Sequence, residues 1–299
     1  MSIYVEILIP GDMDELWQKT QEPKLHQRWD LRFSQIDYLP REDGEAQKFL
    51  YSTRIGAGLR IDGEGESAGE RDNSSGQRTS ALKFWSNDRK SLIQIGSGYW
   101  KYVPCRGGTR FFTSYDYKTR FGVAGSIVDK LMFRPLIGWA TAWSFDRLRL
   151  WIEKGIAPEV SLERAMVYFL TRLTLAFVFF YHGLIPKLVY RSPDELDMLR
   201  NLGVSAFSLL TAVAGWMEIG FALLLIILWR ARWPLWLTMA GMLIATLTVA
   251  IGSPSYFHKA FDPLTLNLSV AVLAACGLLV GRDVPSASRC QRRPPEAER

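Results

Sequence analysis

The chain has 299 residues and a formal net charge of +6; 48% of its residues are hydrophobic and 22% are charged. This length allows about two domains, and no stripe of Lys and Arg interleaves with aromatic residues, so we expect no nucleic-acid partner. The three cysteines, Cys105, Cys276 and Cys290, share no close spacing, so we expect neither a disulfide framework nor a metal site built on them.

The first half begins with the stretch IYVEILI, which predicts a strand, followed by Asp12 and Glu15 at the spacing of a helix N-cap and its partner. The start lacks the basic residues and long apolar run of a cleavable signal peptide, so we expect this half to stay in the cytosol. Six more stretches between residues 33 and 120 read as strands, several with clear period-two alternation. A helical pattern over residues 123–155 closes the half, with Pro135 expected to kink it.

This order of a strand, a helix, about six antiparallel strands and a long helix resembles the START-like, or polyketide cyclase-like, helix-grip superfamily (SRPBCC). The resemblance covers residues 2–153 and is carried by the element order and by Trp17 and Trp29 around the first helix. It implies an α+β domain in which a curved antiparallel sheet wraps the long C-terminal helix and encloses an apolar cavity for lipids, sterols or polyketides. The superfamily has no universal catalytic motif, so the resemblance implies a cavity rather than a reaction.

Strand alternation selects the side chains that would face such a cavity. The same side chains could form ordinary core, because a curved sheet must pack on its long helix in either case. The selected residues are Phe49, Tyr51, Leu59, Ile61, Leu82, Phe84, Phe111, Thr113 and Tyr115.

The second half contains four apolar runs long enough to cross a membrane, which takes roughly 20 residues. They lie at residues 165–186, 204–229, 233–252 and 263–281. Small residues at spacings of three and four predict that the helices pack as a compact four-helix bundle. The excess of basic residues in the loops on the side of the termini predicts a bacterial-type inner (plasma) membrane protein with both termini cytoplasmic.

Two ionisable residues fall inside the predicted spans at similar depth, Arg172 in the first and Glu218 in the second. We expect a buried pair, which would be either a structural contact that fixes helix register or a site that handles protons or a ligand's polar head. Arg172 could instead extend toward the inner headgroups.

A second polar cluster is predicted at the outer rim of the bundle, where His182 and Lys187 follow the first span and His258 precedes the fourth. Two histidines are too few for a metal site, which takes three or four ligands. They would be a hydrogen-bonding pair for a quinone carbonyl or plain interfacial histidines. Asn267 in the fourth span is expected to form an interhelical hydrogen bond.

The stretch YHGLIPKLVYRSPDELDML, followed by AVAGWMEIGFALLL, resembles the DoxX-like membrane family over residues 164–281. His182, Gly183, Pro186, Lys187 and Glu218 carry the resemblance. It implies a small four-helix bundle, and the naming of some members implies a link to quinol oxidation or redox complexes.

These readings predict three regions: a cytosolic helix-grip domain (residues 1–158), a four-helix transmembrane domain (159–281) and a disordered tail (282–299). We expect the protein to bind or hand over an apolar molecule, such as a lipid or a quinone, at the lipid membrane. The alternatives are a quinone-linked redox subunit with a redox or membrane protein partner, and a membrane-anchored assembly factor without a ligand. The sequence shows no catalytic constellation and no cofactor or metal motif, so catalysis is not the expected activity.

Overall fold

The computed structural model of the chain describes residues 2–55, 58–74, 76–201, 203, 207–260 and 262–295. These residues form two compact units. The first contains the described residues up to Leu162 and those from Pro285 onward, and the second runs from Glu163 to Val284. The chain therefore leaves the first unit, builds the second and returns to the first.

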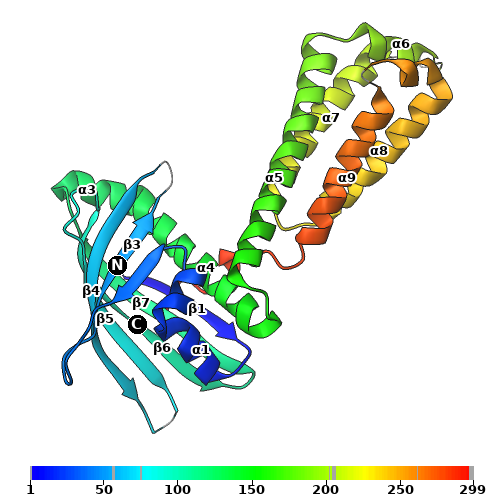
Figure 1. Cartoon of the computed structure of the whole chain (residues 1–299). Helices are drawn as coiled ribbons and strands as arrows, with labels where there is room; N and C mark the ends of the chain where they lie inside the picture. Colours follow the sequence, from blue (N-terminus) through cyan, green and yellow to red (C-terminus); the bar gives the residue numbers. More distant parts are fainter. Residues whose placement is uncertain are drawn as a thin grey trace. The chain divides into compact units, whose positions relative to one another are not determined.

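A seven-stranded antiparallel sheet forms most of the first unit, with strand order β1-β7-β6-β5-β4-β3-β2. The strands curve, and the long helix α4 (Arg134–Lys154) lies along the sheet (Figure 1). The expected α+β helix-grip arrangement is confirmed. The strands are β1 (Ile3–Ile9), β2 (Gln35–Tyr38), β3 (Lys48–Arg54), β4 (Arg60–Asp72), β5 (Arg78–Trp85), β6 (Ile93–Cys105) and β7 (Gly108–Thr119).

Two short helices, α1 (Met13–Gln21) and α2 (Pro23–Trp29), join the first two strands. Asp12 caps α1 as expected, because its carboxylate accepts a hydrogen bond from the backbone N–H of Glu15 at 3.1 Å. After the last strand, α3 (Gly122–Val128) continues through a π-helical turn, η1 (Asp129–Phe133), into α4. Pro135 lies in the first turn of α4, where its missing N–H is tolerated, so the expected irregularity falls just before it.

Glycines lie opposite aromatic residues where the sheet faces its cavity. A Cβ atom added at any of these glycines would come within 2.3–2.4 Å of the partner's ring, so each ring occupies the space above a neighbouring strand that a side chain would fill. Such pairs cover the glycine backbone with apolar surface. The pairs are Phe49 with Gly65, Tyr51 with Gly63, and Phe84 with Gly96.

The segment after the second unit packs on the first unit, so the prediction of a disordered tail is wrong for residues 285–291. Glu6 of β1 and Gln291 exchange two backbone hydrogen bonds of 2.9 Å, which pairs this segment with the free edge of the sheet. The short 3₁₀ turn η4 (Ala287–Arg289) precedes that bridge. Cys290 is buried, with its Sγ 3.2 Å from the carbonyl oxygen of Ala142 in α4. Residues 296–299 of the predicted tail lie outside the described part of the chain.

Asp146 of α4 explains how a segment with little apolar content is held. Its carboxylate is fully buried and accepts the backbone N–H of Ser286 at 2.7 Å. Arg289 from the same segment and Arg149 from α4 each form an ion pair with it at 2.7 Å. A buried carboxylate needs such partners, and composition alone does not reveal that the tail supplies them.

The second unit contains the four apolar helices. These are α5 (Pro158–His182), which continues through the π-helical turn η2 (Gly183–Val189), α7 (Phe207–Ile227), α8 (Trp233–Gly252) and α9 (Pro263–Val280). All four are long and apolar enough to cross a membrane, which confirms the expected spans in the described chain. The short helix α6 (Pro193–Asn201) and the 3₁₀ turn η3 (Pro254–His258) lie between spans. Residues 204–206 of the second predicted run lie outside the described residues.

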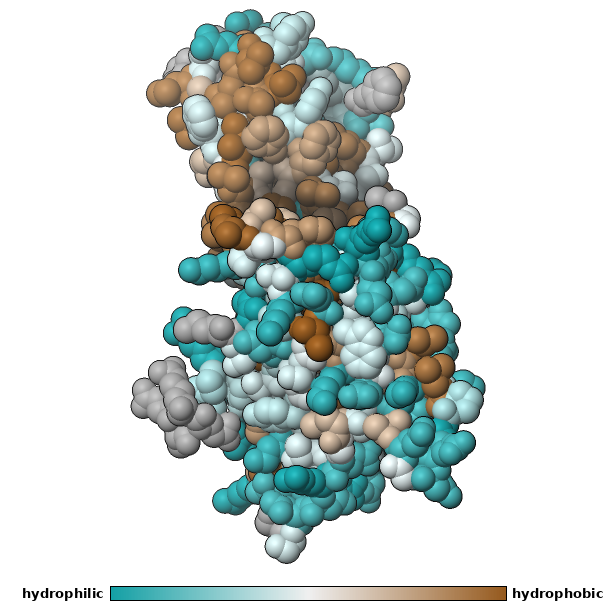
Figure 2. Space-filling model, turned by 90° about the vertical axis from the view of Figure 1, so that its left-hand side faces the viewer, coloured by the Kyte–Doolittle hydropathy of each residue, from teal (hydrophilic) through white to brown (hydrophobic). Residues whose placement is uncertain are grey.

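Close backbone approach holds the helices of the second unit together. A Cβ atom on Gly183 would lie 2.5 Å from the carbonyl oxygen of Gly215, and one on Gly215 would lie 2.8 Å from that of Gly183. Small residues permit such contacts between helices in lipid. Apolar side chains cover much of the visible surface of this unit, whereas the visible surface of the first unit is largely hydrophilic (Figure 2).

Candidate functional site

A cavity of about 410 Å³ lies in the first unit, between the curved sheet and the helices α2 and α4. Apolar and aromatic side chains make up most of its wall, with a few polar groups among them. Small-molecule sites in proteins are commonly pockets of about 300–1,000 Å³ with this kind of wall. The cavity is therefore large enough for a small apolar molecule.

The structure places seven of the nine residues selected by strand alternation on the wall of this cavity. They are Phe49, Tyr51, Ile61, Leu82, Phe84, Thr113 and Tyr115. Leu59 is 40% exposed and precedes β4, so the strand periodicity does not apply to it. Phe111 has the same parity as Thr113, but it is fully buried against Phe145 of α4, with ring centroids 4.5 Å apart, and belongs to the core.

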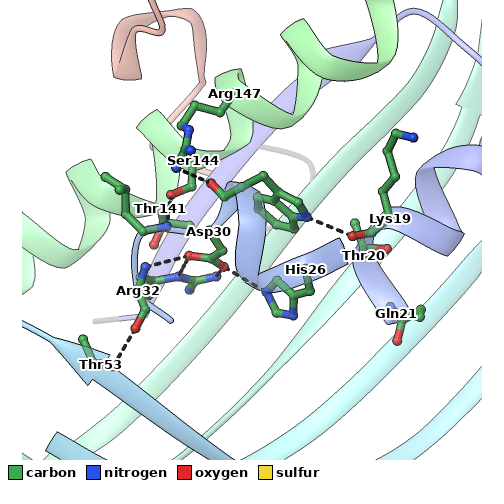
Figure 3. A network of polar contacts seen from close by, with 12 residues as sticks. Lys19, Thr20, Gln21, His26, Asp30, Arg32, Thr53, Thr141, Ser144 and Arg147 are labelled. Carbon is green, nitrogen blue, oxygen red and sulfur yellow. Dashed lines mark hydrogen bonds and ion pairs between the residues drawn. The ribbon is translucent and has the colours of Figure 1, made fainter. Parts of the chain in front are cut away.

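A polar cluster at the cavity was missed by the sequence analysis. It consists of His26 at the end of α2, with Asp30 and Arg32 in the turn that follows (Figure 3). Nε2 of His26 is 3.1 Å from Oδ2 of Asp30. Arg32 binds the same carboxylate through two nitrogens, Nε at 2.9 Å and Nη2 at 2.6 Å. Asp30 is buried, whereas His26 and Arg32 line the cavity.

The charges of this cluster follow from its surroundings. Burial alone would raise the pKa of Asp30, but the charge and hydrogen bonds of Arg32, together with the hydrogen bond from His26, outweigh burial and hold that pKa well below its ordinary value. Burial lowers the pKa of His26 below its ordinary value, despite the opposing effect of Asp30. The cluster therefore holds an ionised Asp30 between a charged Arg32 and a neutral His26.

Aromatic rings enclose the imidazole of His26. The ring stacks on Trp29 with centroids 5.0 Å apart, and it meets the edges of Phe33 at 5.2 Å and Trp100 at 4.9 Å. These neighbours supply no charge that would stabilise an imidazolium, which agrees with the lowered pKa.

Several hydroxyl groups on the cavity wall already donate their hydrogens to the protein. Thr113 donates to the carbonyl oxygen of Tyr99 at 3.0 Å, and Ser80 donates to Oε1 of Gln21 at 3.1 Å. Because Thr141 donates to a backbone carbonyl in its own helix, the contact of 2.9 Å between Tyr115 and Thr141 has the tyrosine as donor. These donors are committed before any ligand enters.

The polar residues predicted in the membrane half do not form the expected pair. Arg172 is fully buried, and it donates to the hydroxyl of Tyr168 at 2.7 Å and to the carbonyl oxygens of Leu225 at 3.1 Å and Leu228 at 3.4 Å. It also binds the carbonyl oxygen of Ala231. The guanidinium thus binds one carbonyl in the last turn of α7 and two in the loop that follows, where the helix no longer supplies backbone partners.

Glu218 instead forms an ion pair with Lys187 of η2, with Nζ and Oε2 3.1 Å apart. The sequence placed Lys187 at the outer rim, and the continuation of α5 through η2 brings it to the depth of Glu218 on α7. The prediction of an Arg172–Glu218 pair is therefore wrong.

In the described part of the chain, no hydrogen bond or ring contact joins the two histidines of this unit. The ring of His182 contacts that of Tyr181, and His258 is exposed in η3. Among the described residues, no group of three or more metal-ligating side chains could hold a metal ion. Asn267 donates a hydrogen bond of 3.1 Å to Thr246 of α8, which is the expected interhelical contact.

The missed cluster at His26 had a weak signal in the sequence. His26 and Asp30 are four positions apart in KLHQRWDLR, the spacing that places two side chains on one helix face. That spacing does not indicate a cavity. The cavity wall beside His26 is formed by strands β3 to β7, which are distant in sequence and come together only in the curved sheet.

Comparison with known proteins identifies relatives of both halves. A model of the DoxX-like family matches residues 176–275. The uncharacterized membrane protein YndG of Bacillus subtilis is 44% identical over 232 residues, which cover 77% of this chain and 79% of the relative.

Solved structures resemble about half of this chain at low sequence identity. A STAR-related lipid transfer protein from Xanthomonas axonopodis is 12% identical with a TM-score of 0.41, covering 51% of this chain and 86% of the other. The di-domain ARO/CYC StfQ from the steffimycin biosynthetic pathway is 15% identical with a TM-score of 0.39, covering 50% of this chain and 49% of the other. The family of this chain follows from its similarity to YndG.

Proposed function

This chain belongs to the family of membrane proteins that includes YndG of Bacillus subtilis, and we propose that it binds an apolar small molecule, a lipid or a quinone-like compound, in the cavity of its first unit. The observation that carries the proposal is the cavity of about 410 Å³, whose wall contains seven side chains selected by strand alternation. A core built only for stability would fill that space, since protein interiors pack with few voids larger than a water molecule.

The four-helix unit supports a role at a membrane. Its spans are rich in exposed apolar side chains, such as Ile251 at 81% and Leu279 at 78% exposed, which suit a lipid environment. A cavity tethered to a bilayer can take up an apolar molecule from the membrane or deliver one to it. The proposed activity is therefore capture or hand-over of that molecule, with lipid as the partner surface.

We further propose a bacterial-type plasma membrane location with both ends of the chain in the cytoplasm. The basic residues on the loops of that side support this orientation. Four spans also return the chain to the side from which it entered, as the return to the first unit requires. A fluorescent protein that matures only in the cytoplasm, fused to the C-terminus, should fluoresce in intact cells; an alkaline phosphatase fusion active at that position would reverse the orientation.

The test of ligand binding is mass spectrometry of organic extracts from the full-length protein purified in mild detergent. The matched variant is Ala140→Trp, which places an indole into the cavity from α4. Val123→Trp is the control, because Val123 is 78% exposed and does not line the cavity.

We expect a defined apolar compound in the wild type and the control, and a several-fold lower yield in Ala140→Trp. The same compound at full yield in all three proteins would move the binding site into the second unit and favour the redox reading. Its absence from all three proteins would leave the cavity without a natural ligand and contradict the proposal.

A further inference from the structure

Asp30 fixes which nitrogen of His26 carries the hydrogen. The carboxylate of Asp30 is ionised and lies 3.1 Å from Nε2, so the hydrogen of the neutral ring is on Nε2. Nδ1 therefore carries a lone pair. Among the described residues, no other group hydrogen-bonds to the ring of His26, whose side chain is 12% exposed and lines the cavity.

Arg32 makes this arrangement rigid. Its guanidinium holds Asp30 with two hydrogen bonds, and its carbonyl oxygen accepts a hydrogen bond of 2.6 Å from Thr53 on β3. The backbone N–H of Leu31, between these residues, donates to Ser144 of α4 at 2.9 Å. The turn is thereby tied to both walls of the cavity, and Asp30 cannot turn away from the histidine without breaking these bonds.

His26 lines a cavity on whose wall several hydroxyl hydrogens are already donated to protein acceptors, so these hydroxyl groups do not supply a hydrogen to the lone pair of Nδ1. A ligand with only carbonyl or ether oxygens cannot use this acceptor. A ligand with an O–H or N–H group can, and an unmade hydrogen bond in a buried site costs free energy.

We propose that the cavity selects apolar ligands that carry a hydroxyl or N–H donor, which hydrogen-bonds to Nδ1 of His26 while Asp30 holds Nε2–H. The inference rests on the proposed function, because it needs the cavity to bind a ligand. It narrows the ligand class from apolar molecules in general to those with one polar donor, such as phenols, quinols or sterol-like alcohols, over their carbonyl or ether counterparts.

The test compares two probes that differ by one donor, 1-naphthol and 1-methoxynaphthalene, on the full-length protein in detergent. Binding is followed by tryptophan fluorescence, and the ratio of the two affinities is compared between proteins so that partition into micelles cancels. We expect the wild type to favour 1-naphthol about five- to tenfold more than His26→Phe does, as one net hydrogen bond would give. Phenylalanine keeps an aromatic ring against Trp29, and Thr113→Val, which removes a committed hydroxyl on the same wall, should keep the wild-type ratio.

A second readout is direct, because the chain has three histidines. In protein labelled with ¹⁵N-histidine, the signals missing from His26→Phe belong to His26. We expect a neutral ring protonated at Nε2 whose Nδ1 signal moves with 1-naphthol and stays in place with 1-methoxynaphthalene.

The outcomes separate the two proposals. If both probes bind and His26→Phe leaves the ratio unchanged, or if Nδ1 carries the hydrogen, the donor selection is wrong while the cavity still binds apolar molecules. If neither probe binds to the wild type, or if Ala140→Trp binds both as well as the wild type does, the cavity is not the binding site and the proposed function fails with the inference.

Discussion

At the scale of single residues, His26 and Arg172 show two ways in which a polar side chain is accommodated inside this protein. Arg172 donates to four carbonyl or hydroxyl oxygens, so its contacts explain it as a cap for the end of α7. Among the described residues His26 has one hydrogen-bond partner, Asp30, and it lines the cavity. The first residue is accounted for by the fold, whereas the second leaves a hydrogen-bonding position for a ligand.

His26 and Asp30 of the cavity cluster predict how the stability of the protein depends on pH. The folded-state pKa of His26 lies below 6.5, so as the pH falls below that value the unfolded chain binds a proton that the folded chain refuses. The folded-state pKa of Asp30 lies below 3.8, so its contribution is present above that value and is lost as the pH falls further. Both effects weaken the folded state on acidification.

We therefore expect the thermal unfolding midpoint of the full-length protein to be lower at pH 5.5 than at pH 7.5. The titration of His26 changes the free energy of unfolding by at most about 1.4 kcal/mol per pH unit. His26→Phe should weaken this dependence of stability on pH, even if the substitution lowers the midpoint at both pH values. Thermal unfolding of both proteins at the two pH values measures the change in midpoint. An equal change in the wild type and in His26→Phe would show that His26 does not titrate in this range.

At the scale of elements, the sequence analysis succeeded where one element has one regular period. Several of the strands alternate, and the four spans are long apolar runs, so both were located without knowing what they pack against. The failures came where two elements meet. Lys187 reaches Glu218 because α5 continues as η2, and Arg172 reaches the end of α7 because the two helices are neighbours.

The contact between Gly183 of η2 and Gly215 of α7 yields a prediction about these elements. Gly183→Ala would place a Cβ atom 2.5 Å from the carbonyl oxygen of Gly215, so the helices must separate. We expect a loss of about 1–3 kcal/mol in the stability of the second unit, as for an overpacked core, measured by denaturant unfolding in detergent.

Gly220→Ala is the matched control in α7, since a Cβ atom there meets nothing within 4 Å. It should be neutral or stabilise by up to about 1 kcal/mol, because alanine favours a helix more than glycine does. Similar losses in both variants would mean that the Gly183–Gly215 approach does not hold these helices together.

At the scale of the whole molecule, the chain path joins the two units twice. The chain leaves the first unit after Leu162 and returns at Pro285, and the returning segment pairs with β1 and with Asp146. The last residues are therefore part of the first unit, although they are distant from it in sequence.

Removing the returning segment should destabilise the first unit. A chain that ends at Val284 loses the bridge between Glu6 and Gln291, buried Cys290 and two partners of Asp146. We expect a loss of about 2–4 kcal/mol, because the buried carboxyl group of Asp146 loses a hydrogen bond and an ion pair. Limited proteolysis of the sheet and thermal unfolding measure the change.

The control for that truncation is a chain that ends at Pro294, which retains all of these contacts and should behave like the full-length protein. If the chain ending at Val284 is as stable as this control, the returning segment contributes nothing to the first unit.

The sequence by itself determined the class of each half: an α+β sheet domain and a four-helix membrane domain, with seven of the side chains that line the cavity. Periodicity and run length suffice for this because they report on one face of one element at a time. Tertiary structure alone decided the partners of Arg172, Lys187 and Glu218, the docking of the tail on Asp146, and the arrival of His26 at the cavity. Each of these depends on hydrogen bonds and ion pairs between elements distant in the chain, which exist only once the sheet has curved and the helices have packed.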